Sequence, residues 1–543
     1  MKRSIILCFA VWMTAVANTF ACTNLIVGKN ASADGSTIVS YSADSYGLFG
    51  ELYHYPAATY PKGTMLKVYE WDTGKYLGEI EQARQTYNVV GNMNEYQVTI
   101  GETTFGGRPE LTDSTGIIDY GSLIYIGLQR SRTAREAIKI MTDLVQEYGY
   151  YSGGESFTIA DPNEVWIMEM IGKGPGIRGA VWVAVRVPDD CISAHANQAR
   201  IHQFDMNDKE NCRYSPDVVS FAREKGYFNG VNKDFSFSLA YAPLDFGARR
   251  FCEARVWSYF NKFTDRGNEY LPYIEGKTDT PMPLFVKPKQ KLSVQDVKNM
   301  MRDHYEGTPL DISNDFGAGP YKTPYRLSPL NFKVDDKEYF NERPISTQQS
   351  GFVFVAQMRA HMPDPVGGVL WFGVDDANMT VFTPVYCCAT KVPVCYTRVD
   401  GADYITFSWN SAFWIFNWVS NMVYPRYDLM IVRETQKEME STFNTAQAGI
   451  EEMAVKLLEK DKDAAINFLT NYTNMTAQST FDTWKQLGTF LIVKYNDGVV
   501  KRMKDGQFER NSIGQPAGVL RPGYPKEFLQ EYVKQTGNRY LVK

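Results

Sequence analysis

The feature that most constrains this chain is a cysteine that stands between a removable leader and a strand pattern. Two basic residues precede an apolar run at residues 5–16, and small residues stand at Thr19 and Ala21. This layout is typical of a secretory signal peptide that is cleaved after Ala21. Cleavage there would make Cys22 the first residue of the mature chain, so that a thiol and a free α-amino group would belong to one residue.

The leader predicts export, with a signal peptide at residues 1–21 and a periplasmic or extracellular protein after cleavage. A lipoprotein is the less favoured alternative, because lipoprotein signals have an aliphatic residue three positions before the cysteine and a small one two positions before it. Thr19 and the bulky Phe20 occupy those positions here. No later segment reaches about 18 uninterrupted apolar residues, so no membrane span is expected.

The number of cysteines in the mature chain is odd, so at least one of them cannot form a disulfide within the chain. Of the eight cysteines, Cys8 belongs to the leader, and the odd number that remains in an oxidising compartment makes Cys22 the natural candidate for a free thiol. Whether the others form disulfides or stay as buried thiols is left open: Cys191, Cys212, Cys252, Cys387, Cys388 and Cys395. The last three lack the paired spacing of a zinc site, and neither a metal nor an organic cofactor is predicted.

Size and charge limit the classes of protein to which this chain can belong. A chain of 543 residues is too long for one ordinary core, which predicts several domains or one large domain with extensions. Lys and Arg number 57 against 62 Asp and Glu, which gives a net charge of −5 without a basic cluster. A nucleic-acid partner is therefore not expected. The 34 tyrosines and 31 phenylalanines favour a sheet-rich protein.

Hydrophobic periodicity predicts strands through most of the chain. The pattern begins with strand, turn and strand across residues 24–40, where Asp34-Gly35 is a hairpin signal. A helix is expected at residues 133–148, followed closely by Gly149. Further strands are predicted at residues 87–100 (two strands around a turn), 156–160, 164–170, 182–187, 191–194, 351–358, 369–374 and 379–385. Short helices are predicted at residues 218–225, 248–260 and 294–304, the last within a stretch of surface connections at 265–350.

The last part of the chain differs, because apolar positions at helical spacing replace the strand pattern. Helices are predicted at residues 433–462, 463–472 and 480–494, and the aromatic-rich residues 407–423 are expected to form a buried strand or helix. The sequence therefore predicts an α+β protein with a helical C-terminal extension at residues 431–543. Whether this extension pairs subunits into a homo-oligomer is left open.

Two kinds of chemistry are open to Cys22. A terminal amine has a pKa of about 7.7–8.0, so the amine of Cys22 itself could accept the thiol proton without a histidine. The alternative is the cysteine, histidine and asparagine set of papain-like proteases, for which His195 and Asn197 are candidates. Papain-like enzymes place the cysteine at a helix start, whereas Cys22 opens a strand pattern. The remaining histidines have no motif around them and are interpreted as structural: His54, His202, His304 and His361.

Other hydrolytic and nucleotide-dependent chemistries find no support in the sequence. It contains no Gly-x-Ser-x-Gly elbow, no His-Glu-x-x-His pattern and no P-loop. Serine hydrolase, zinc peptidase and nucleotide-binding functions are accordingly disfavoured.

Five segments in order carry a resemblance to a known family. Residues 22–36, Cys-Thr-Asn-Leu-Ile-Val-Gly-Lys-Asn-Ala-Ser-Ala-Asp-Gly-Ser, resemble the mature N-terminus of the dipeptidase A family. The family is related to penicillin V acylases and bile-salt hydrolases among N-terminal-nucleophile hydrolases. The other similar segments are Ala-Asp-Pro-Asn-Glu-Val-Trp at 160–166, Arg-Val-Pro-Asp-Asp at 186–190, Ala-Asn-Gln-Ala-Arg-Ile at 196–201, and Gln-Met-Arg at 357–359 leading to Val-Leu-Trp at 369–371.

The resemblance implies a four-layer αββα sandwich whose N-terminal strand carries the nucleophile between two sheets. It implies that Cys22 is nucleophile and general base in one, and that Asp44 holds the terminal amine. Asn197 maps to the asparagine beside the oxyanion. Arg250 maps to a polar-network arginine near the cysteine, with Arg249 as its close rival.

One position departs from the family pattern. Where the superfamily usually has an arginine three residues before the acid, this chain has Tyr41. The charge of an arginine would favour the thiolate, and a tyrosine cannot replace that charge. Either another cation serves at the site, or activity is low or altered.

These observations lead to one predicted function and two alternatives. The prediction is an exported dipeptidase, with a catalytic domain at residues 22–430, that hydrolyses small peptides through an acyl-enzyme on Cys22. Within hydrolases, the alternative is an amidase of the penicillin V or bile-salt acylase kind. From another class, the alternative is a non-catalytic envelope protein that retained the fold, to which the departure at Tyr41 gives weight.

Overall fold

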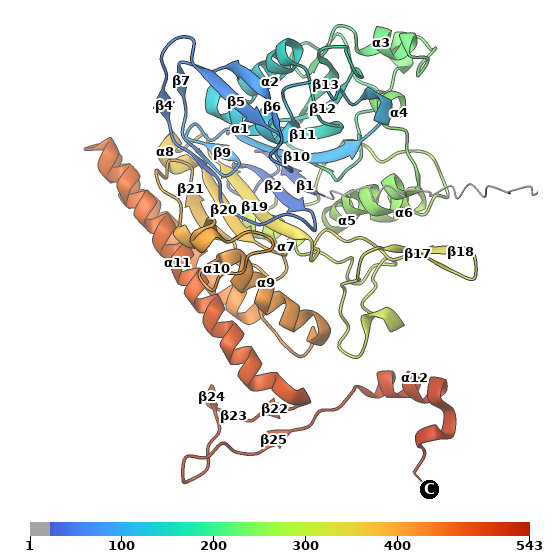
Figure 1. Ribbon diagram of the computed structural model, residues 1–543, viewed down its shortest axis with the longest axis vertical. Coiled ribbons are helices and arrows are strands. Elements are labelled where there is room, and N and C mark those ends of the chain that lie inside the picture. The colour runs from blue at the N-terminus through green and yellow to red at the C-terminus, as the bar shows by residue number, and fades with distance from the viewer. Residues whose placement is uncertain (1–21, 543) are drawn as a thin grey trace, which may run out of the picture.

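The structure is a computed structural model that describes residues 22–542 (Figure 1). The predicted signal peptide at residues 1–21 lies outside the described residues. Within residues 22–542, none of the helices has both the length and the apolar character that a membrane crossing needs.

Cys22 stands two residues before a strand of a seven-stranded antiparallel sheet. That strand, β1, is an uninterrupted apolar run after its first residue, and every residue in it is buried. A short run of this kind is typical of a strand covered on both faces. In spatial order the sheet contains β16 (Phe285–Val286), β14 (Ile192–His195), β1 (Asn24–Val27), β2 (Thr37–Asp44), β19 (Ser350–Met358), β20 (Val369–Val374) and β21 (Thr383–Tyr386).

A second antiparallel sheet has eight strands. Its long central strands pair residue by residue, with β11 between β10 and β12. In spatial order it contains β15 (Cys212–Tyr214), β13 (Ala180–Val187), β12 (Val165–Gly172), β11 (Gly154–Ala160), β10 (Thr99–Gly106), β9 (Met93–Asn94), β8 (Val89–Val90) and β3 (His54–Tyr55).

The two sheets pack face to face where β1 and β2 meet β10 and β11. Gly101 permits this close approach, because a Cβ atom there would lie 2.4 Å from Oδ1 of Asn24. The side-chain nitrogen of Asn24 donates to the carbonyl oxygen of Glu102 at 2.7 Å. The start of β1, and with it Cys22, is thus fixed against the middle of the second sheet.

Helices cover the outer faces of both sheets, which gives the order helix, sheet, sheet, helix (Figure 1). The eight-stranded sheet is covered by α1 (Tyr120–Arg130) and α2 (Ala134–Tyr148), whose apolar faces form a core with that sheet. The seven-stranded sheet is covered by α5 (Ala254–Phe263), α7 (Val294–Met300), α9 (Ala412–Val423), α10 (Arg433–Leu458) and α11 (Lys462–Tyr495).

The remaining elements lie in connections and at the C-terminal end. They are β4 (Ala58–Thr59), β5 (Met65–Tyr69), β6 (Tyr76–Glu81), β7 (Gln85–Thr86), α3 (Val218–Glu224), α4 (Phe237–Tyr241), α6 (Gly267–Ile274), β17 (Asn331–Val334), β18 (Lys337–Phe340), α8 (Asp364–Gly367), β22 (Val500–Lys501), β23 (Met503–Lys504), β24 (Gln507–Phe508), β25 (Val519–Leu520) and α12 (Lys526–Thr536).

The predicted helix at residues 133–148 is confirmed as α2. Its N-terminus is capped by Thr133, whose side chain accepts from the backbone N–H of Glu136, and it ends at Gly149 with φ of 80°. Both features match the sequence signals for a helix start and stop.

The prediction of two helices at residues 463–472 and 480–494 is wrong, because one helix, α11, runs through both and through the polar residues between them. Thr476 lies in that polar stretch and Thr480 directly follows it, and their hydroxyls donate to carbonyl oxygens of the preceding turn at 3.0 and 2.8 Å. Hydroxyls that are satisfied within the helix can be buried, so tertiary packing overrides the weak local preference.

The C-terminal helices share polar contacts with the sheets. Arg359, which follows β19, forms a two-pronged ion pair with Glu451 of α10, with nitrogen–oxygen distances of 2.6 and 2.7 Å. Tyr386 of β21 donates to the same carboxylate at 3.0 Å. The first helices of the predicted extension at residues 431–543 therefore serve as the outer cover of the seven-stranded sheet.

Glu451→Gln is expected to lower the free energy of unfolding by about 3–5 kcal/mol, because it leaves the buried guanidinium of Arg359 without a charge partner. Urea unfolding measures the change. The matched control is Glu452→Gln, which alters an exposed pair with Lys456 and is expected to leave stability unchanged. Equal stability of the two variants would contradict the integration of α10 into the sheet core.

Candidate active site

The sulfur of Cys22 faces a cavity of about 520 Å³ between the two sheets. The residue is buried, with an exposed fraction of 4%. Cys22 precedes Thr23, and Thr23 forms an antiparallel β-bridge with Ser42 of β2. This bridge holds Cys22 beside the cavity, just ahead of β1. Other groups that line the cavity include Tyr41, Asp44, Glu102, Thr104, Tyr120, Trp71 and Asp72.

The nearest polar groups to the sulfur are a hydroxyl and a carboxyl group. Sγ of Cys22 lies 3.7 Å from the Tyr41 hydroxyl and 3.5 Å from Oε1 of Glu102. Tyr41 in turn donates to that same oxygen at 2.6 Å. Burial, followed by the negative charges of Glu102 and Asp44, raises the pKa of the Cys22 thiol well above its usual range. The thiol is therefore neutral at physiological pH and needs a base to become a nucleophile.

Asp44 ends strand β2 and is completely buried. Arg343 donates to Oδ2 at 2.6 Å, and Ser42 donates to the same oxygen at 3.0 Å. Ser350 donates to Oδ1 at 2.6 Å. These contacts fix the carboxylate near the start of the chain's first strand, beside Cys22.

Asn197 follows β14 in a left-handed conformation with φ of 64°, which asparagine tolerates better than most residues. Its Nδ2 donates at 2.8 Å to the carbonyl oxygen of Thr104, a residue that lines the cavity. Its Oδ1 accepts from Arg255 at 2.9 Å. The amide is thus oriented from both ends.

Arg255, rather than Arg250 or Arg249, is the arginine that contacts Cys22. Its Nη1 donates to the carbonyl oxygen of Cys22 at 2.6 Å, and its Nη2 donates to the carbonyl oxygen of Ala196 at 3.0 Å. Arg250 forms an ion pair with Glu342. The structure therefore does not bring Arg250 to the position that the resemblance implied.

The ion pairs of Arg249 and Arg250 explain this difference. Residues Ala248–Glu253 form a π-helical segment before α5, and both arginines in this segment have ion-pair partners other than the cysteine. Arg249 pairs with Asp279 instead. A signal for Arg255 was present in the sequence, because it is a charged residue among the apolar positions of a predicted helix. Such a residue needs a buried polar partner.

His195 is committed to structural hydrogen bonds. Its Nδ1 lies 2.7 Å from the Thr103 hydroxyl and its Nε2 lies 2.6 Å from the Thr158 hydroxyl. Burial, and then the charge of Arg200, lower the pKa of the ring to about 3. A neutral ring with both nitrogens engaged cannot act as the base that a papain-like mechanism requires.

His195→Gln is expected to lower turnover by far less than the 10²–10⁴-fold that removal of a general base costs. A second readout is stability. The unfolded chain protonates this ring near pH 6.5 and the folded chain near pH 3, so stability is full above pH 6.5 and falls as pH drops toward 3. Between pH 7 and pH 5, wild type should lose about 2 kcal/mol more than the variant in urea unfolding. Loss of all turnover in a folded variant would instead support the papain-like route.

The cysteines that follow Cys22 are free thiols, so no disulfide joins the described residues 22–542. Burial raises the pKa of Cys191 and Cys212 to about 11, and that of Cys388 and Cys395 to about 12. These thiols are poor nucleophiles at neutral pH.

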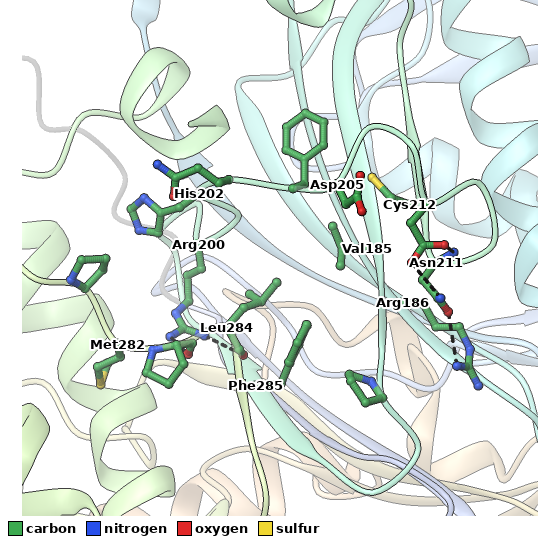
Figure 2. Close-up of a pocket in the computed structure, with 16 residues that line it drawn as sticks. Val185, Arg186, Arg200, His202, Asp205, Asn211, Cys212, Met282, Leu284 and Phe285 are labelled. Carbon is green, nitrogen blue, oxygen red and sulfur yellow. Dashed lines mark hydrogen bonds between the residues drawn. The ribbon is translucent and has the colours of Figure 1, made fainter. Parts of the chain in front are cut away.

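A second hollow, of about 650 Å³, lies beside β13 and β15 and does not contain Cys22. Figure 2 shows His202 and Cys212 on opposite sides of it, so they form no cysteine and histidine pair. Arg200, at its wall, is bound to Glu253 at 2.9 Å and to backbone carbonyl oxygens. This hollow therefore lacks an activated nucleophile, and the cavity at Cys22 is the candidate active site.

The site and the sequence comparison together define an enzyme of the cysteine peptidase class. The chain belongs to peptidase family C69, whose sequence profile matches residues 21–54 and 48–440. The predicted kinship with dipeptidase A proteins and the prediction of a peptidase are confirmed by this match and by the relatives.

Three relatives illustrate the similarity. A probable dipeptidase of Salmonella dublin is 29% identical over 400 residues, which cover 70% of this chain and 84% of the relative. A probable dipeptidase of Latilactobacillus sakei is 26% identical over 504 residues, which cover 88% of this chain and 97% of the relative. Dipeptidase A of Lactobacillus helveticus is 23% identical over 419 residues, which cover 73% of this chain and 80% of the relative.

Proposed function

We propose that this chain is a dipeptidase that works through a cysteine acyl-enzyme, with the α-amino group of mature Cys22 as general base. The observation that carries the proposal is the surroundings of the sulfur. Within residues 22–542, its polar neighbours are a tyrosine hydroxyl and a carboxyl group rather than a histidine. The relatives named dipeptidases support the substrate class.

The mechanism needs a base because the thiol of Cys22 is held neutral. The free amine accepts the thiol proton while sulfur bonds to the scissile carbonyl carbon, and the carbonyl electron pair moves onto oxygen. As the intermediate collapses, the carbon–nitrogen bond breaks and the proton passes to the leaving amino acid. Water then attacks the thioester and gives a proton to the amine. That proton returns to sulfur when the acid leaves.

Two side chains support this chemistry by position. Arg255 holds the carbonyl oxygen of Cys22, which fixes the residue that attacks. The amide nitrogen of Asn197 donates one of its two hydrogens to the carbonyl oxygen of Thr104. Its second hydrogen can be donated to the developing oxyanion. A donor of this kind is worth on the order of 3–4 kcal/mol in the transition state. Every step uses protein groups and water.

The proposal extends to fold class and location. The order of layers, helix, sheet, sheet and helix, supports assignment to the N-terminal-nucleophile hydrolases. The leader pattern at residues 1–21 supports export to the periplasm or the exterior. Under this proposal, removal of the leader and activation of the enzyme are one event.

A substrate panel tests the function. Mature enzyme that begins at Cys22 is assayed with dipeptides, penicillin V and a bile-salt conjugate, and dipeptides are expected to give the highest kcat/KM. Preference for either acyl amide would replace the dipeptidase proposal with an acylase. Absence of all turnover, together with no preferential labelling of Cys22 by a thiol-directed electrophile, would support a non-catalytic protein.

A further inference from the structure

Among residues 22–542, a buried carboxyl group beside the nucleophile has no ion-pair partner. Glu102, in the middle of β10, has an exposed fraction of 1% and lines the cavity. Its Oε1 accepts from Tyr41 and from the Cys22 thiol, and the carboxyl group of Glu155 is a further hydrogen-bond partner. Glu102 takes part in no ion pair within residues 22–542.

The carboxyl groups near Glu102 supply no positive charge to balance it. Glu155, on the adjacent strand, is also buried. Burial raises the pKa of both carboxyl groups, and the charge of Glu102 together with a hydrogen bond between the two groups raises the pKa of Glu155 further, so Glu155 keeps its proton. Asp72 lines the same cavity, and burial raises its pKa to about 7.

Four other deeply buried carboxylates in this protein have arginine partners, whereas Glu169 and Asp375 are stabilised by neutral hydrogen-bond donors. The pairs are Asp44 with Arg343, Glu253 with Arg200, Glu440 with Arg302 and Glu451 with Arg359. A buried negative charge without such a partner is costly, and a cation that enters the site would relieve that cost. Glu102 is therefore arranged to receive a cation from outside the described chain.

The reaction brings a cation to this place. In a dipeptide, the carbon next to the scissile carbonyl carries the free α-ammonium group. Attack requires the carbonyl carbon to lie about 3–3.5 Å from the sulfur, so the ammonium nitrogen is held within a few ångströms of it. Oε1 of Glu102 lies 3.5 Å from that sulfur, which is within reach of the ammonium group.

We propose that Glu102 binds the free α-ammonium group of the substrate and so makes the site select unblocked peptides over acyl amides. This inference rests on the proposed dipeptidase function. It also accounts for Tyr41, because a neutral hydroxyl donor leaves the charge of Glu102 uncompensated, whereas an arginine at that position would supply the cation itself.

The experiment compares two substrates that differ in the ammonium group alone, Ala-Phe and propionyl-Phe. Wild-type mature enzyme is expected to prefer Ala-Phe strongly in kcat/KM. Glu102→Gln should reduce this preference about 100-fold, because it removes one partner of a buried charge pair. The loss should fall on Ala-Phe, and Glu102→Asp should recover part of it. Glu338→Gln, on the exposed β17–β18 hairpin, is the matched control and should keep the preference.

Tyr41→Arg provides an independent variant, and it should also reduce the preference because its guanidinium occupies the place of the ammonium group. An unchanged preference in Glu102→Gln would overturn the inference while leaving the dipeptidase function intact. Equal losses on both substrates, with a shifted pH dependence of Cys22 labelling by iodoacetamide, would also overturn it, because Glu102 would then act on the enzyme's own amine. If wild type hydrolyses neither substrate nor any other dipeptide, the proposed function itself fails.

Discussion

Cys22→Ala is expected to reduce dipeptide turnover by on the order of 10⁴-fold or more while leaving the fold intact. The substitution removes the sulfur that would form the acyl-enzyme, and loss of a nucleophile commonly has effects of this size. The side chain is small and borders a cavity, so its truncation creates little new empty space in the core. Stopped assays with dipeptides measure the loss, and thermal unfolding checks the fold.

Two further variants make the Cys22 result specific. Cys22→Ser retains a weaker nucleophile and should keep a small residual activity. Cys191→Ala removes a buried thiol that directly precedes strand β14 and should keep wild-type turnover. Full turnover by Cys22→Ala would remove this residue from the mechanism.

The local elements of the fold were predictable from sequence because their signals are local. Strand β1 follows from its apolar run, and α2 follows from its cap, its periodicity and the terminal Gly149. Helix α1 was not predicted, because residues such as Tyr125 and Ile126 favour strands. Its formation depends on Asp119, which caps the first turn, and on packing against the sheet.

The polar surroundings of Cys22 were predictable only in part, because they are assembled from distant segments. Asp44 and Asn197 followed from the resemblance, and the structure brings both near the cysteine. Glu102 and Arg255 stand 80 and 233 residues after Cys22, and no local pattern links them to it. The roles assigned to Asp44 and Asn197 stay predictions until variants are assayed.

The departure at Tyr41 has a structural explanation. The expected arginine would have placed a cation beside the thiol, whereas the cations near the start of the chain come from Arg255 and Arg343. Arg255 donates to the Cys22 carbonyl oxygen and Arg343 donates to Asp44, whereas Tyr41 donates a neutral hydroxyl to Glu102. The site therefore differs from the family pattern in charge as well as in sequence.

A chain that keeps residues ahead of Cys22 is expected to be less active than the mature chain by on the order of 10²–10⁴-fold, the range typical of a lost general base. An amide nitrogen cannot accept the thiol proton, whereas a free amine with a pKa of about 7.7–8.0 can. The buried thiol, held neutral by Glu102 and Asp44, has no other base among its hydrogen-bond partners in the described residues that would replace the amine without loss.

One measurement tests this claim most directly. Residues 1–21 are replaced by a tag that a site-specific protease removes directly before Cys22, and dipeptide hydrolysis is measured before and after the cut. A matched chain in which the cut leaves one glycine ahead of Cys22 is the control. The account predicts that activity appears when Cys22 becomes the first residue and stays low in the glycine control. Equal turnover before and after the cut would contradict it.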